Sequence, residues 1–359
     1  MGNRKISYSR LSITLIVIIA AIAGTDYLRR NFSSISDSDN SEPFSDSYSL
    51  IETTTAGSYD ESNNEPEITA IDFSQYNTID KSYDAIAIGE LVVVSKSHKS
   101  SFPDIESELV TFPYRTERTY RVTDYVELKV YESVVEAVEN MLGDFCAETG
   151  NHDVTITAGY RNEEKQSEAL ATGYSKDDVG ASEHHTGYAV DFKIVTDDKK
   201  ISVLENSGIF SWIYENSYKY GLVQRYTEDK AYLTDVLARS YHFRYVGIPH
   251  AYYMHENNLC LEEYIDLLEN YEFDKKHLEI NTDTYAYEVY YIRAETEGDT
   301  KVYVPKNSEY SISGNNIDGF IVTVLKGTAT AEPVSSDNTA FTEAPSSEMP
   351  DIMTGTEVS

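Results

Sequence analysis

The sequence has few cysteines, which cross-link small secreted domains, and few basic residues, which bind nucleic acids. Its 359 residues include two cysteines, and 29 Lys and Arg against 61 Asp and Glu. Two cysteines are too few for a disulfide framework, so Cys146 and Cys260 either form one bridge or are small buried apolar residues. The net charge of −32 argues against nucleic acid as a partner, because affinity for phosphate backbones depends on Lys and Arg.

Basic residues are absent from two long stretches of the chain. None lies between Arg30 and Lys81, and none follows Lys326. Residues 31–69 are rich in Ser, Asp, Glu, Asn and Thr and poor in aliphatic residues, so they bury too little apolar surface to offset their ordering entropy. This composition predicts a disordered acidic linker at 31–69 and a disordered acidic tail at 327–359.

Long apolar runs are also scarce, and the one present is close to the N-terminus. Residues 13–24 read ITLIVIIAAIAG and follow Arg4, Lys5 and Arg10. A positive flank before an apolar run is typical of exported chains with the N-terminus inside. We interpret residues 1–30 as an uncleaved membrane anchor, which predicts a single-pass protein with an extracellular C-terminal domain. A cleaved signal peptide, and thus a secreted protein, is the alternative.

The middle of the chain alternates between helix and strand patterns. Leu91 to Val94 has the pattern of a first buried strand, and Val154 to Ala158 that of another. Between them, Ser133 and Glu136 form a capping box for a helix that ends at Gly150. Without a regular βαβ repeat, this order predicts an α+β domain with a central antiparallel sheet over residues 70–272.

Short alternating runs separated by turn residues follow at residues 273–326. They predict a small β module, either a packing appendage, which we favour, or a wall-binding accessory.

Candidate metal ligands lie in two strand-like segments. In the segment 182–191, SEHHTGYAVD, apolar residues alternate with Asp191, which predicts that Asp191 faces away from the core, within reach of His184 in the preceding turn. The segment 241–246, YHFRYV, places His242 on the polar face of another strand. Two imidazoles and a carboxylate are ligands that catalytic zinc accepts, with a fourth position open. The sequence therefore predicts a Zn²⁺ site of His184, Asp191 and His242.

These motifs resemble the VanY-type D-alanyl-D-alanine carboxypeptidases, zinc peptidases with the hedgehog/DD-peptidase fold. The likeness covers roughly residues 85–270 and includes the segments 158–161 (AGYR), 220–226 (YGLVQRY) and 241–247 (YHFRYVG). It implies a metallocarboxypeptidase, of D,D or L,D specificity, that hydrolyses a terminal D-Ala from peptidoglycan stem peptides. It also implies that Arg161, Gln166 and Ser182 bind the substrate.

One position departs from the family pattern. Where the family reads Glu-Pro-Trp-His, with Glu as general base, this chain reads Arg239-Ser240-Tyr241-His242. A guanidinium stays protonated and cannot accept a proton, and loss of such a proton shuttle costs roughly 10²–10⁴-fold in rate.

Four other carboxylates are candidates for the missing base, namely Asp235, Glu228, Glu183 and Glu256. The sequence thus leaves two readings open: a carboxypeptidase with rerouted proton transfer, or a catalytically silent relative that binds zinc and cell-wall peptide.

Overall fold

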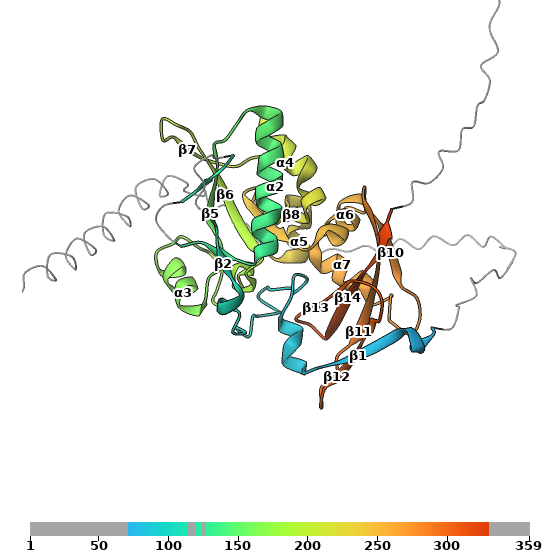
Figure 1. Ribbon diagram of the computed structural model, residues 1–359. Helices are drawn as coiled ribbons and strands as arrows, with labels where there is room; N and C mark the ends of the chain where they lie inside the picture. Colours follow the sequence, from blue (N-terminus) through green and yellow to red (C-terminus); the bar gives the residue numbers. More distant parts are fainter. Residues whose placement is uncertain (1–70, 114–118, 124–126, 330–359) are drawn as a thin grey trace, which may run out of the picture.

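The computed structural model describes residues 71–113, 119–123 and 127–329, in two halves that lie side by side (Figure 1). The predicted anchor and linker, and all but the first three residues of the predicted tail, lie outside these ranges. In the described residues no helix has the length and apolar character needed to cross a membrane.

The first half is built on a mixed sheet that is almost entirely antiparallel. Only the pair β3–β5 is parallel. The strand order is β3 (Arg121–Val122), β5 (Val154–Ala158), β6 (Ala189–Val195), β9 (His242–Tyr245) and β8 (Leu222–Gln224), and β7 (Ile201–Val203) pairs with β6. Two short strands, β2 (Val110–Thr111) and β4 (Lys129–Val130), pair beside it.

One face of this sheet is covered by α2 (Glu132–Thr149), which crosses in front of it in Figure 1. Its apolar side interdigitates with apolar residues of the strands in a single buried cluster that includes Val138, Phe145, Val190, Phe192 and Phe243. Because side chains alternate along a strand, the residues next to these on β6 and β9 point to the opposite face. That face carries the candidate metal ligands.

Helices α6 (Ile248–Glu256) and α7 (Leu261–Leu268) join the two halves. Residues of both helices share a buried cluster with Leu278, Val289 and Ile321 of the second half. That half is an antiparallel sheet in the order β10 (Leu278–Asn281), β11 (Tyr285–Arg293), β14 (Gly319–Thr328) and β13 (Tyr310–Gly314).

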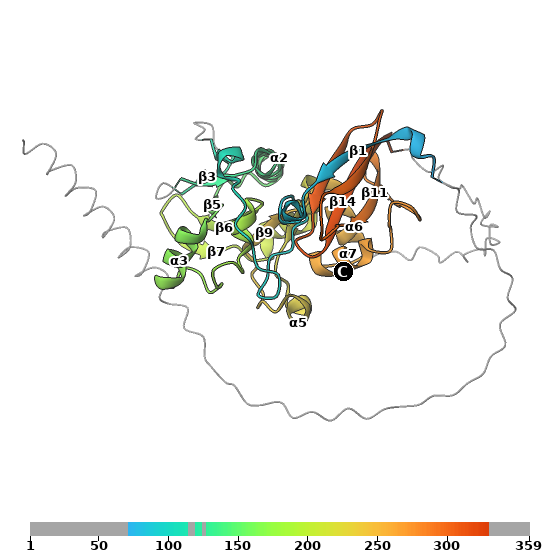
Figure 2. The same cartoon turned by 90° about the horizontal axis from the view of Figure 1, so that it is seen from below.

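An N-terminal strand also belongs to the second half. β1 (Tyr76–Lys81) pairs antiparallel with β12 (Thr300–Pro305), so residues more than 200 positions apart lie side by side (Figure 1). Figure 2 shows β1, in blue, against the orange and red strands of the second half. The remaining helices, α3 (Glu163–Ala171), α4 (Ser211–Asn216) and α5 (Ala231–Thr234), belong to the first half. The division into domains at residue 272 stays a prediction.

Several local predictions are wrong in detail. Leu91 to Val94 are buried, as expected, but they form no strand. Their backbone groups are hydrogen-bonded to separate residues of other segments and not to a single partner strand. Val93 N donates to the carbonyl of Asn315, and the Arg244 guanidinium donates to the carbonyl of Val92 at 2.9 Å. Likewise, α2 begins at Glu132 after Tyr131 and has no side-chain cap, so Ser133 is not its capping residue.

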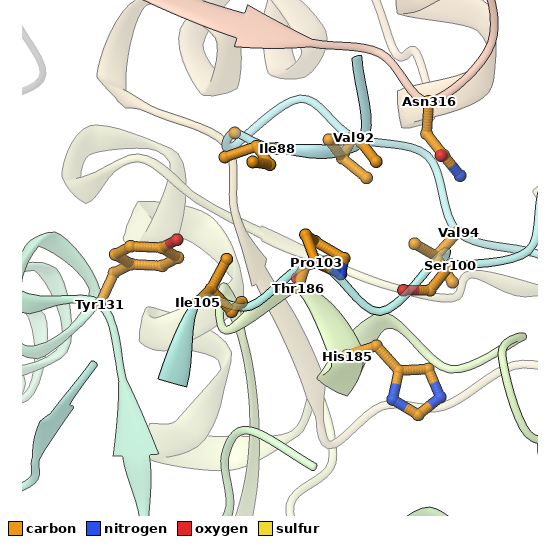
Figure 3. Close-up of a pocket in the computed structure, with 12 residues that line it drawn as sticks. Ile88, Val92, Val94, Ser100, Pro103, Ile105, Tyr131, His185, Thr186 and Asn316 are labelled. Atoms are coloured by element: carbon orange, nitrogen blue, oxygen red, sulfur yellow. The ribbon is translucent and has the colours of Figure 1, made fainter. Parts of the chain in front are cut away.

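The seam between the halves is tightly packed. Figure 3 shows Val92 and Val94 across from Ile105 and His185, around a cavity of about 10 Å³ that has room for one water at most. Both cysteines are free thiols, Cys146 on α2 and Cys260 at the start of α7. The reading as apolar packing residues is therefore the one the structure supports.

The link between the halves predicts a specific pH dependence of stability. His250 on α6 bonds the Tyr264 hydroxyl at 2.7 Å and the Thr323 hydroxyl of β14 at 2.9 Å. Burial lowers the pKa of His250 to about 3, from 6.5. The unfolded chain therefore binds the extra proton below pH 6.5, and stability falls as the pH falls.

Between pH 7 and pH 5 this group alone costs about 2 kcal/mol. We expect His250→Gln to remove that part of the pH dependence in urea unfolding, with the same change at the exposed His255 of α6 as control. Equal pH slopes for the wild type and His250→Gln would contradict this assignment.

Candidate metal centre

The three predicted ligands meet on the open face of the central sheet. Asp191 on β6 and His242 on β9 are directly opposite each other in the antiparallel register, which puts their side chains on one face. His184 comes from a short 3₁₀ helix, η4 (Glu183–Thr186), just before β6. One ligand atom from each residue lies within 4.8 Å of the others. The structure thus brings the predicted triad together.

Both imidazoles are oriented by bonds from the nitrogen that faces away from the centre. His184 Nδ1 is 2.8 Å from the carbonyl of Gly159, which leaves Nε2 facing Asp191 at 3.3 Å. His242 Nε2 is 3.0 Å from the Glu183 carboxylate, which leaves Nδ1 facing Asp191 at 2.7 Å. Such outer partners fix the tautomer and ring orientation of metal-binding histidines.

A glycine makes the turn between His184 and β6 possible. Gly187 ends η4 with φ +76°, and a Cβ there would lie 2.9 Å from the Leu109 side chain. Any other residue would be strained in this conformation and would clash. The glycine thereby allows His184 and Asp191, seven residues apart, to face the same point.

Glu183 is the centre of a buried network of charges behind the ligands. Its carboxylate lies 3.2 Å from Arg225 and 3.5 Å from Arg244, and all three side chains are at most 2% exposed. Arg225 also forms a bidentate ion pair with Glu262 of α7, with hydrogen bonds of 2.7 and 2.8 Å. A continuous chain of charges therefore runs from His242 through Glu183 and Arg225 to the helix that joins the two halves.

The electrostatics of the centre favour a positive charge between the ligands. Burial lowers the pKa of His242, but its bonds to Asp191 and Glu183 raise that pKa above the ordinary value. Burial lowers the pKa of His184 to about 4, and the Arg161 guanidinium adds to that effect. Burial would raise the pKa of Asp191, but His184 and His242 hold it well below its ordinary value. The carboxylate is therefore ionised and the His184 imidazole neutral at pH 7, which is the state that binds metal.

Each of the predicted substrate-binding residues has a buried polar atom without a hydrogen-bond partner. These atoms are Arg161 Nε, Gln166 Oε1 and Ser182 Oγ. Three further unpartnered atoms belong to the charged network behind the ligands, namely Glu183 Oε1, Arg225 Nε and Arg244 Nη1. Buried polar groups are normally bonded, so the first three atoms are candidates for bonds to a polar ligand.

None of the four candidate bases named from the sequence reaches the centre from the open side. Glu228 and Glu256 are exposed, and Asp235 pairs with Lys96 at 3.1 Å with its side chain 77% exposed. Glu183 is committed to His242 and the two arginines.

Arg239 occupies the family position of the base and forms a two-pronged ion pair with Asp177, at 2.9 Å for Nη1 to Oδ2. Sequence reasoning missed Asp177, because it lies in a loop without any motif.

The buried network predicts that replacing a buried arginine lowers the free energy of unfolding more than replacing an exposed lysine does. Arg225→Met leaves two carboxylates without their shared partner, and breaking a buried pair costs about 3–5 kcal/mol. We expect a loss of that size in the free energy of unfolding by urea. Lys275→Met is the control, because Lys275 is 58% exposed in its pair with Glu272, and such pairs contribute under about 1 kcal/mol. Equal losses for both variants would refute the network.

The chain is similar to known carboxypeptidases. Residues 127–248 match the family model VanY, D-alanyl-D-alanine carboxypeptidase. A D-alanyl-D-alanine carboxypeptidase from Enterococcus faecium is 31% identical over 244 residues, which are 67% of this chain and 76% of that protein. The crystal structure of the vancomycin resistance D,D-dipeptidase VanXYg, in complex with a D-Ala-D-Ala phosphinate analog, is 28% identical. The match covers 70% of this chain and 99% of the VanXYg chain, with a TM-score of 0.60.

A D,D-pentapeptidase VanY from a VanB-type resistance cassette has been solved in complex with Zn(II). It is 26% identical and covers 49% of this chain and 98% of that chain, with a TM-score of 0.38. The identity and coverage of the E. faecium relative settle the family. The chain belongs to the VanY family of D-alanyl-D-alanine carboxypeptidases.

Proposed function

We propose that this chain is a zinc-dependent carboxypeptidase that removes the terminal D-alanine from peptidoglycan stem peptides. The observation that carries the proposal is the orientation of the two histidines. Each has one nitrogen bonded to a protein acceptor and the other directed at Asp191. Two imidazole nitrogens and one carboxylate oxygen match the donor set of catalytic zinc sites.

His184 Nε2, His242 Nδ1 and Asp191 would hold the zinc, which when bound supplies Lewis-acid activation of water and carbonyl. Arg161 offers a cationic fork for the terminal carboxylate or for the carbonyl oxygen of the scissile bond. Gln166 and Ser182 offer buried atoms, Oε1 and Oγ, that hydrogen-bond the peptide. A D-Ala-D-Ala terminus is the substrate that this proposal places first, ahead of an L,D bond.

We also propose that the peptidase domain acts outside the cell membrane. Peptidoglycan stem peptides are exposed outside the cell membrane, and the apolar run at residues 13–24 with its basic flank suits an anchored chain with the peptidase domain outside. The acidic composition fits a peptide partner and no nucleic acid.

A second function is favoured by one observation. Arg239 stands where the family has its general base and is fully engaged with Asp177. A protein that binds zinc and cell-wall peptide without hydrolysing it is consistent with that substitution.

Release of D-alanine distinguishes the two functions. We expect the zinc-loaded full chain to release D-alanine from a peptide that ends in D-Ala-D-Ala. His184→Ala should abolish both release and zinc binding in a chelator competition, because it removes one of three ligands. The control is His255→Ala, which changes an exposed histidine of α6. Zinc and peptide binding without release by the wild type would favour the silent relative.

A further inference from the structure

This inference rests on the proposed function. Peptide hydrolysis requires a carboxylate that transfers a proton, and position 239 does not provide one. We propose that Asp177 performs this proton transfer and that Arg239 positions it. In the family pattern the carboxylate stands at position 239. In this chain Arg239 stands there, and the carboxylate that it contacts is Asp177, in another loop.

Arg239 lies one aromatic ring away from a metal ligand. The Tyr226 ring stacks on the His242 ring at a centroid distance of 5.6 Å and an interplanar angle of 10°. The Arg239 guanidinium lies 5.5 Å from the centroid of the same tyrosine ring. Its partner Asp177 is close enough to the centre for His242 and His184 to contribute to lowering the pKa of its carboxyl.

Asp177 is fixed at two points. Arg239 holds the carboxylate with both terminal nitrogens, and Gln166 Nε2 donates to the Asp177 carbonyl at 2.7 Å. The Asp177 side chain is 12% exposed, so it is held by protein contacts and still keeps some surface accessible to solvent. A carboxylate offers about four lone-pair sites, so the arginine fork leaves one on each oxygen for a proton.

Other carboxylates near the centre are already committed. Asp191 faces both imidazoles, and Glu183 lies behind His242 with no exposed surface. Among the described carboxylates, these two and Asp177 are the ones whose pKa values are perturbed by the site histidines. Of the three, Asp177 is the one whose carboxylate bonds neither histidine; its side-chain partner is Arg239.

The electrostatic environment keeps Asp177 ionised and ready to accept a proton. Burial alone would raise its pKa, but Arg239, and to a smaller extent His242 and His184, hold the pKa below its ordinary value. The other titratable groups facing it are His185 and Tyr241. A weaker base is slower than an ideal one, since proton transfer is most efficient when the pKa lies near the working pH.

In the proposed step, water attacks the carbonyl carbon of the scissile amide while an Asp177 carboxylate oxygen accepts one water proton. The C–N bond breaks, and Asp177 returns that proton to the leaving amino nitrogen of D-alanine. The products are D-alanine and a peptide shortened by one residue, and Asp177 is ionised again. Arg239 keeps its proton throughout and orients the carboxylate.

The test uses the zinc-loaded full chain and two substitutions in the pair. Asp177→Asn should lower kcat by about 10²–10⁴-fold and change zinc affinity and the affinity for a D-Ala-D-Ala phosphinate by less than about threefold. In an Asp177→Ala background, Arg239→Glu should restore kcat at least tenfold, because it returns a carboxylate to the other side of the pair. Asp178→Asn, an exposed carboxylate next in the same loop, is the matched control.

The outcomes separate the two proposals. If the wild type releases D-alanine and Asp177→Asn does so within threefold, Asp177 is not the proton acceptor and the proposed function stands. If Asp177→Asn loses zinc or phosphinate affinity in parallel with kcat, Asp177 is structural and the inference fails. If the wild type binds zinc and phosphinate but releases nothing, both the hydrolytic function and the role of Asp177 are wrong.

Discussion

The interaction on which the site depends is the buried contact between Glu183 and His242. A carboxylate with no exposed surface is costly unless its charge is matched, and Arg225 and Arg244 match it here. The match has a functional consequence, because Glu183 fixes His242 Nε2 and so decides which nitrogen faces the centre. The tautomer of one candidate ligand is therefore set by residues that never touch the metal.

The same network explains why the second half of the molecule matters to the first. Arg225 reaches Glu262 on α7, and α7 packs against the C-terminal sheet through a shared apolar cluster. Arg244 ties the buried segment at residues 90–92 to β9. Packing between the halves thus holds the charges that orient the ligands.

The sequence predicted the parts of the site that local patterns encode. Alternation along the strands placed Asp191 and His242 on the face away from the core. It failed where long-range contacts decide. Leu91 to Val94 lack a partner strand despite their strand-like composition, and the role of Asp177 depends on Arg239, 62 residues away. Neither local propensity nor motif spacing carries that information.

The proposed function requires a preformed zinc site that Glu183 orients from behind. The sharpest test is anomalous diffraction at the zinc absorption edge, from crystals of the zinc-loaded protein. We expect one strong peak about 2.0–2.2 Å from His184 Nε2, His242 Nδ1 and an Asp191 oxygen, with Glu183 still bonded to His242 Nε2. A peak coordinated by Glu183 or by His242 Nε2, or no peak among these residues, would contradict it.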